Sequence, residues 1–245
     1  HGDALSGKSA SWSGSMLLGI GWALLDARVG DNRPHRHIAH QICLAVDNPC
    51  EIGGAARMHL AAGEAALIPA GISHCLAPVG TVLRTIYVDP LFRGMRSAVQ
   101  SPIISRLCAG QATALKAVKC GHSARQWIED YLGTEAARAI DRRLQVGLVG
   151  LEPGIGPAAL AQRLGLSPAR LREVAVRDFG VPTAKLLQWL QLQQAIEALQ
   201  QSQNLADAAA AGGFSDQAHF TRRLVEWLGV TPAQGLARLE ISVIR

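Results

Sequence analysis

The sequence predicts an α+β protein of two domains: an antiparallel β-barrel with trailing helices, then an all-helical domain. Three observations predict this division. The first 90 residues run as short apolar segments broken by Gly, Pro, Asp and Asn, whereas turn residues become rarer after Pro90. The last hundred residues contain one helix-turn-helix pattern twice. We therefore place the domains at 10–133 and 134–245, with the barrel at about 14–90 and the trailing helices at about 100–132.

The barrel is expected from five apolar segments, at 15–27, 37–46, 57–60, 65–69 and 81–88. Short segments at such spacing are typical of small antiparallel barrels. The stretches 101–108, 112–119 and 123–132 look helical, and we expect them to form a dimer face or a connector. Breaks are expected at Gly133, as a domain boundary, and within 150–156, as a loop inside the second domain.

Two segments of the expected barrel carry histidines at regular spacing. The first reads G-x4-H-x-H-x3-Q from Gly30, and the second reads G-x5-P-x-G-x2-H from Gly63 to His74. Alternate side chains of a strand share one face, so His40 should point away from the other polar residues of the first segment. The residues expected on the shared face are His35, His37, Gln41 and Cys43.

This pair of segments resembles the two cupin motifs. The resemblance implies a metal site of His35, His37, Gln41 and His74, with Cys43 as an additional candidate ligand. Three imidazoles with an amide oxygen or a thiolate suit a divalent transition metal such as zinc, nickel, iron or manganese. Cupin sites usually carry Glu at the position of Gln41, and its loss lowers affinity for hard cations. The alternative is a metal-free pocket, shaped by the histidines, for an organic ligand.

The helical repeat in the carboxy-terminal half indicates a duplicated unit. Gly165 and Ser167 recur 48 positions later, whereas Gly180 recurs 49 positions later as Gly229, so we expect one residue to have slipped inside the second helix. In each copy a Gly makes the turn and a Ser is expected to cap the next helix. Alanine-rich packing helices precede the turns, at 157–163 and 205–211.

These residues resemble the AraC/XylS family of transcription regulators over roughly 134–240, through the run GFSDQAHFTR and the signature LGVTP at 228–232. The resemblance implies a bridging helix at 183–200 and two recognition helices in successive major-groove segments, ~34 Å apart. The family usually carries Arg at the position of Gln191 and Phe at that of Ala175. The residues expected to face bases are Ala169, Arg170, Arg172 and Glu173 in the first unit, and Gln217, Ala218, His219, Thr221 and Arg222 in the second.

Arg, Gln and Glu at these positions suit direct base readout. The alternative is that Arg170 and Arg172 touch phosphates or lie on a solvated helix face. The implied partners are double-stranded DNA and a small-molecule or metal effector, with a homodimer expected and RNA polymerase as a further candidate.

Composition sets the remaining bounds. The net charge of +5 and pI near 9.2 permit nucleic-acid binding, but the excess is +3 in residues 1–140 and +2 in 141–245. Five cysteines without a spaced framework suit a reducing compartment. No apolar run approaches the roughly 20 residues that span a bilayer, and the start lacks a secretory pattern, so we expect a cytoplasmic protein.

The sequence therefore predicts a DNA-binding transcription regulator, not an enzyme, whose barrel senses a small molecule or a transition-metal ion. The competing hypothesis is a metal-dependent cupin enzyme, a dioxygenase or isomerase, fused to a DNA-binding domain. It requires a metal with an open position and an acid–base group beside it. The sequence shows no paired carboxylates near the histidine motifs.

Overall fold

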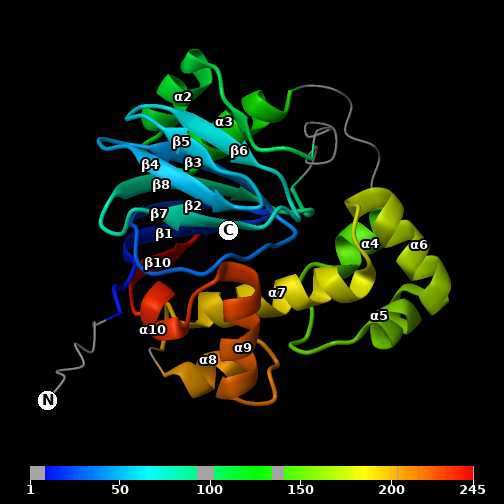
Figure 1. Ribbon diagram of the computed structural model, residues 1–245. Coiled ribbons are helices and arrows are strands. Elements are labelled where there is room, and N and C mark those ends of the chain that lie inside the picture. The colour runs from blue at the N-terminus through cyan, green and yellow to red at the C-terminus, as the bar shows by residue number, and fades with distance from the viewer. Residues whose placement is uncertain (1–8, 93–101, 134–140, 203, 245) are drawn as a thin grey trace, which may run out of the picture.

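The structure is a computed structural model that describes residues 9–92, 102–133, 141–202 and 204–244 (Figure 1). The amino-terminal part holds two facing sheets, and the helices α4 to α10 lie beneath and beside them. Among the described residues, no helix is long and apolar enough to cross a membrane.

The larger sheet has seven strands in the order β10-β1-β2-β8-β3-β6-β9, and the smaller has three in the order β5-β4-β7. Their bounds are β1 Ser13–Gly19, β2 Trp22–Arg28, β3 His40–Ala45, β4 Cys50–Gly54, β5 Met58–Leu60, β6 Ala65–Ile68, β7 His74–Ala77, β8 Val82–Val88, β9 Ser105–Arg106 and β10 Arg238–Val243. The expected segment 15–27 is a hairpin of β1 and β2, because Gly21 makes the turn at a φ of 78°. The five apolar segments therefore located most of the sheet, but β4 and β7 were missed.

Alternation along β3 builds two cores on opposite faces of the large sheet. Cys43 and Ala45 face the small sheet, whereas Ile42 and Leu44 face the helices α2 (Ala109–Lys116) and α3 (Gly121–Leu132). Helices at 112–119 and 123–132 were expected, and α2 and α3 confirm them approximately.

The expected helix at 101–108 is wrong over the described residues from Pro102 onward. Ser105 and Arg106 form β9, which pairs with β6 at the sheet edge. The guanidinium of Arg106 binds the Glu64 carboxylate at 2.6 Å, so the edge of the sheet supplies partners that an isolated helix would lack.

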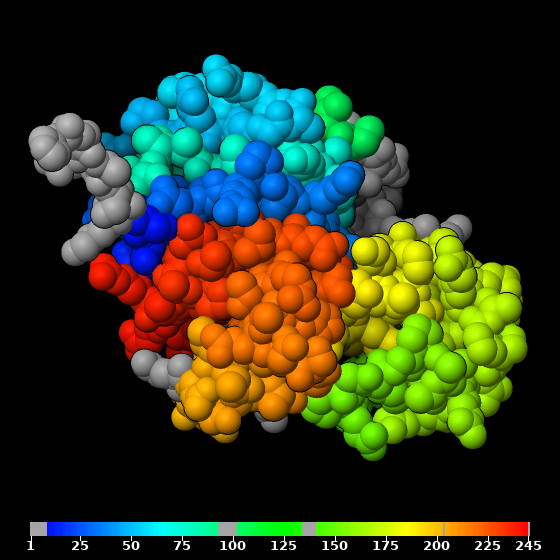
Figure 2. Space-filling view, turned by 60° about the horizontal axis from the view of Figure 1, so that its bottom comes forward, coloured from blue at the N-terminus to red at the C-terminus, as the bar shows by residue number. Residues whose placement is uncertain are grey.

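The carboxy-terminal part contains the expected pair of helix-turn-helix units. The first comprises α4 (Arg142–Gly147), α5 (Pro157–Leu164) and α6 (Pro168–Phe179), and α7 (Thr183–Ala198) is the bridge. The second comprises α8 (Leu205–Ala211) and α9 (Gln217–Leu228), followed by α10 (Pro232–Gly235). In the space-filling view the first unit, green to yellow, and the second, orange, lie beside each other on the side away from the small sheet (Figure 2).

The helical carboxy-terminal part ends in one strand that the sequence did not predict. Residues Arg238–Val243 form β10, which pairs in parallel with β1 over six positions. The free edge of β1 offers unpaired N–H and C=O groups, and an extended tail satisfies them. β10 therefore becomes the edge strand of the larger sheet, next to β1.

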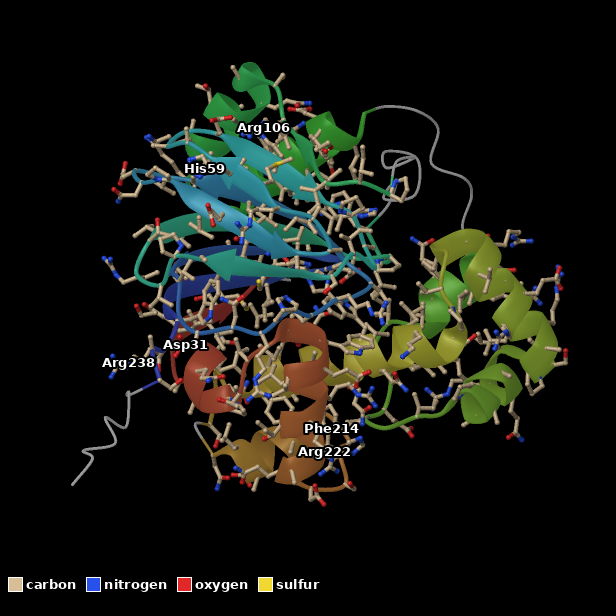
Figure 3. The ribbon with its side chains drawn as sticks, in the orientation of Figure 1. Asp31, His59, Arg106, Phe214, Arg222 and Arg238 are labelled. Atoms are coloured by element: carbon tan, nitrogen blue, oxygen red, sulfur yellow. The ribbon has the colours of Figure 1, made fainter. Side chains whose placement is uncertain are left out.

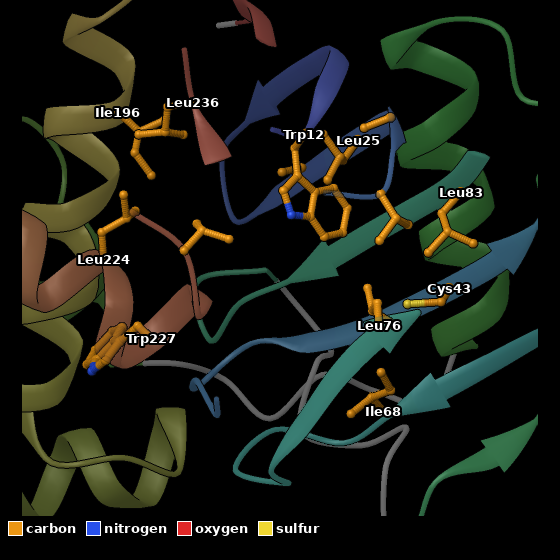
Figure 4. Packing of buried hydrophobic residues seen from close by; sticks show 14 of the residues in the cluster. Trp12, Leu25, Cys43, Ile68, Leu76, Leu83, Ile196, Leu224, Trp227 and Leu236 are labelled. Carbon is orange, nitrogen blue, oxygen red and sulfur yellow. The ribbon is translucent and has the colours of Figure 1, made fainter. Parts of the chain in front are cut away.

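One hydrophobic core runs through both parts. Buried Leu25, Ile68 and Leu83 of the sheets belong to the same cluster as Trp227 of α9 and Leu236 at the end of α10 (Figure 4). The first helix-turn-helix unit has its own core, which includes Leu160, Leu171 and Phe179. The second unit is thus packed on the barrel, while the first is a lobe of its own.

Candidate functional site

The two recognition helices, α6 and α9, have the same length and the same ends. Each has 12 residues, an oxygen-bearing N-cap and a left-handed Gly C-cap, Gly180 or Gly229. Ser167 accepts from the Arg170 N–H at 3.1 Å as expected, but the second cap is Asp216, which accepts from the His219 N–H at 2.7 Å. Ser215 is therefore not the cap, and the extra residue of the second copy lies in the turn rather than inside the helix.

The expected base-facing residues lie in the first two turns of each recognition helix. Counted from the caps, Arg170 corresponds to His219, and Arg172 corresponds to Thr221. The exposed members of the set are Ala169, Arg170, Arg172, Glu173, Gln217, Ala218 and Arg222, while His219 and Thr221 are half-buried.

Three of these side chains are already engaged. Arg170 pairs with Glu173 at 2.8 Å, and the His219 Nδ1 lies 3.2 Å from the Ser215 hydroxyl. Arg222 and Phe214 lie in the second unit on its far side from the sheets (Figure 3). The first turns of α9 thus remain accessible, although Trp227 in its last turn is buried.

The two units touch through glycines, and α7 links both. A Cβ on Gly213 would lie 2.3 Å from the Gly154 nitrogen, so only glycine fits this contact. The Gln191 amide donates to the Gly213 carbonyl at 2.9 Å, and the Gln194 amide donates to the Leu151 carbonyl at 3.2 Å. Gln191, at the position where the AraC/XylS family usually carries Arg, thus holds this turn, while Ala175 is fully buried in the first unit's core.

The three histidines of the barrel motifs come together, as the sequence predicted. One ring nitrogen from each of His35, His37 and His74 lies within 4.8 Å of the others, and all three residues are buried. A backbone bridge between His35 and His74 joins the two motifs. His40 faces away, and its Nδ1 accepts from the Ala70 N–H at 2.9 Å.

Each ring is oriented by a backbone carbonyl. The Nδ1 atoms of His35, His37 and His74 lie 2.7, 2.9 and 2.8 Å from the carbonyl oxygens of Arg33, Ala39 and Ile72. A carbonyl oxygen only accepts, so an Nδ1–H donor leaves Nε2 with its lone pair for a metal. This is the arrangement that fixes histidine ligands in metal sites.

Gln41 lies between two of the rings. Its Oε1 is 3.0 Å from the His37 Nε2 and 2.8 Å from the His74 Nε2, while its Nε2 is 3.3 Å from the Cys43 Sγ. His37 and His74 each face an acceptor oxygen at both ring nitrogens, but a neutral imidazole carries only one N–H. One of the two contacts of each ring therefore lacks a donor hydrogen. A cation at the three Nε2 atoms would remove this conflict, and so would an amide turned to donate one N–H to each ring.

The electrostatics of the cluster favour neutral rings. Burial, and then the neighbouring histidines, lower the pKa of His35 to about 4 and that of His37 to about 3, and burial lowers the pKa of His74. Neutral imidazoles are the form that binds a metal. Metal–nitrogen bonds of about 2.1 Å allow at most ~4.2 Å between two ligand nitrogens, so three nitrogens within 4.8 Å of one another lie near the spacing that a shared metal needs.

Cys43 lies behind Gln41. It is fully buried, and burial raises the pKa of its thiol to about 12, which disfavours the thiolate. No Asp or Glu joins the histidine cluster among the described residues. The donor set is therefore three imidazoles and one amide, and it fits a borderline divalent metal better than a hard cation.

Comparison with known proteins places the helical part in a family. Residues 160–238 match a family model described as a helix-turn-helix domain, and this range runs from within α5 through α6, the bridge α7 and the second unit. Residues 160–238 form an AraC-type helix-turn-helix domain. No curated protein sequence matches the chain.

The two-part fold is similar to solved structures of ToxT from Vibrio cholerae. ToxT from strain O395 superposes with a TM-score of 0.56 at 9% identity, over 87% of this chain and 96% of that chain. ToxT with an unsaturated fatty acid bound gives 0.52 at 10% identity, over 86% and 92% of the two chains. ToxT bound to (E)-4-(8-methylnaphthalen-1-yl)but-3-enoic acid gives 0.52 at 8% identity, over 87% and 97%.

The AraC-type domain touches the histidine site at two places. Gly229, the C-cap of α9, packs against His35: a Cβ there would lie 2.5 Å from the His35 Nδ1. The Arg33 N–H donates to the Gly229 carbonyl at 2.8 Å, so the end of the recognition helix is bonded to the loop that carries His35.

The second contact is aromatic. The Trp189 ring of α7 lies 5.8 Å from the His37 ring and is stacked on the Trp227 ring of α9 at 5.4 Å. The Trp189 indole also donates to the Asp89 carboxylate at 3.1 Å. Neither Gly229 nor Trp189 was expected in the site, because only the tertiary fold brings α7 and α9 to the barrel.

Proposed function

We propose that the protein is a sequence-specific DNA-binding transcription regulator whose barrel senses a transition-metal ion or a small molecule. The observation that carries the proposal is the pair of equal recognition helices, with accessible first turns, in an AraC-type domain. Helices of this kind present their first turns to base edges in the major groove. The residues proposed to face bases are the nine that the sequence predicted. They lie in the first two turns after the N-caps of α6 and α9.

For the metal, the ligands of the proposal are the Nε2 atoms of His35, His37 and His74 with the Gln41 Oε1. A bound divalent ion would supply positive charge at the point where two rings face an acceptor. A metal that repositions these rings would alter the contacts of His35 with Gly229 and of His37 with Trp189. A ligand shifts an equilibrium only through its different affinity for two states, and these contacts provide such a difference.

Small-molecule sensing is supported by the fold. Two ToxT structures of the same fold hold carboxylic acids, so this architecture accommodates organic ligands. The enzyme hypothesis finds less support. Among the described residues the cluster holds imidazoles and an amide, without the acidic ligand or acid–base group that the chemistry needs.

DNA binding is tested on the full chain with randomised duplex oligonucleotides at low salt, followed by selection of the retained sequences. We expect a bipartite site with two half-sites about one helical turn apart. Arg172→Ala should cost about 1–3 kcal/mol on the selected site and relax one base position. The control Arg125→Ala removes the same charge from α3, remote from both units, and should leave affinity unchanged. Retention of no duplex, or equal losses in both variants, would contradict the proposal.

Metal sensing is tested by elemental analysis of the purified chain and by DNA titrations with and without zinc, nickel, iron or manganese. We expect near one equivalent of metal and a shift in DNA affinity, both lost in His37→Ala and His74→Ala. His59→Ala is the control, because His59 is exposed on β5. Metal bound equally by all three variants would place it elsewhere.

A further inference from the structure

A cavity lies between the larger sheet and the bridging helix α7. It has a volume of about 70 Å³ and lies between the strands β1, β2 and β8, the helix α7 and the end of α9. Its walls are mostly apolar and include Leu18, Ala23, Leu192, Ile196 and Leu228. A cavity that holds one water needs roughly 10–15 Å³, so this one has room for a short organic molecule.

One wall of the cavity carries Asp89, a buried acid without a cationic partner. Its two oxygens accept from the Leu91 N–H at 2.8 Å and the Trp189 indole at 3.1 Å. None of the ion pairs found among the described residues involves this carboxylate. A carboxylate has about four lone-pair sites, so Asp89 retains capacity for further donors.

A second acceptor lies one helical turn away. Gln193 follows Trp189 by four positions on α7, so both side chains share the face turned to the cavity. The Gln193 Oε1 is buried and has no hydrogen-bond partner. The indole nitrogen of Trp22, another wall residue, packs against Gly19 at the β1–β2 turn.

We propose that this cavity binds a small apolar molecule that carries an amine. The apolar walls would hold the hydrocarbon, while an ammonium would donate to Asp89 and to the Gln193 Oε1. A carboxylic acid would place like charge beside Asp89, and an alcohol would supply one donor where the wall offers two acceptors. The inference deepens the proposed function, on which its regulatory meaning rests, because the occupant would touch both α7 and α9.

The test is binding of a matched series, hexylamine, hexanol and hexanoate, to the full chain by calorimetry at pH 8. We expect hexylamine to bind at least tenfold more tightly than hexanol, and hexanoate to bind most weakly. Asp89→Asn keeps the shape but removes the charge, so hexylamine should lose its advantage over hexanol. Hexanoate binding as tightly as hexylamine, or an unchanged preference in Asp89→Asn, would overturn the inference.

Two further variants locate the bound amine. Ala23→Leu fills the cavity without touching a polar group and should abolish binding of the whole series, whereas Gln200→Met changes an exposed glutamine beyond α7 and should change nothing. Hexylamine bound equally by Ala23→Leu would place it outside this cavity. Retention of duplex DNA is measured on the same samples. A protein that binds DNA but not hexylamine refutes this inference alone, and one that binds hexylamine but not DNA refutes the regulator function alone.

Discussion

Substituting Gly229 by alanine tests whether the recognition helix α9 is fixed to the histidine site. At a φ of +69° an alanine costs about 1–2 kcal/mol from the left-handed backbone alone. The new Cβ would also lie 2.3 Å from the Arg33 oxygen and 2.5 Å from the His35 Nδ1, closer than packed atoms allow. Relief of this clash costs a further ~1–3 kcal/mol, and losing the Arg33-to-Gly229 hydrogen bond adds about 1 kcal/mol.

The matched control is Gly165→Ala. Gly165 has a nearly identical φ of +66° at the end of α5, but a Cβ there meets nothing within 4 Å. It should therefore lose only the backbone contribution. In urea unfolding, with a slope of about 2–3 kcal/mol/M, the Gly229 variant should unfold roughly 1 M below the Gly165 variant. Equal midpoints would refute the tight contact, and with it the route from the barrel to α9.

Three further predictions concern charge, metal and the contact between the units. Burial raises the pKa of Asp89 from 3.8 to about 6, so the folded state binds this proton more tightly and loses about 3 kcal/mol of stability as pH rises from 4 to above 6. The unfolding free energy of Asp89→Asn minus that of the wild type should thus be larger at pH 8 than at pH 4; a difference independent of pH would be inconsistent with a buried charge. Gln41→Glu adds a negative ligand and removes the amide that can stand in for a metal, so zinc affinity by chelator competition should rise at least tenfold; no rise would exclude position 41 from the ligand set. Gly213→Ala should weaken binding to the selected bipartite site at least tenfold while leaving single half-sites unaffected, because its Cβ would press on the Gly154 backbone; losses equal on both duplexes would show a general folding defect.

The helical half was largely predictable because its signals are local. Gly165 and Ser167 mark a turn and an N-cap by their own backbone and side-chain chemistry, and the structure confirms both. The error in the second copy is also local in origin. Ser215 and Asp216 are adjacent residues that can each cap a helix, and the direction of the Asp216 side chain decided between them.

The histidine site was predictable in composition but not in geometry. His35, His37 and His74 were identified from their spacing, yet strand alternation alone does not explain the cluster, because β3 begins only at His40. An isolated bridge and a loop place the first two rings. The expected helix at 101–108 failed for a related reason, since β9 gains its hydrogen bonds from β6, about 40 residues earlier in the chain.

The amino-acid sequence by itself determined the two halves, the duplicated helix-turn-helix unit and the three histidines that cluster, because periodicity, capping and residue type act over a few neighbouring residues. Tertiary structure alone decided that β10 returns to β1, that Gly229 meets His35 and that Trp189 lies between a barrel acid and a recognition helix. These contacts join residues from 100 to more than 200 positions apart. They exist because the free edge of β1 and the apolar faces of α7 and α9 each need a partner to exclude water.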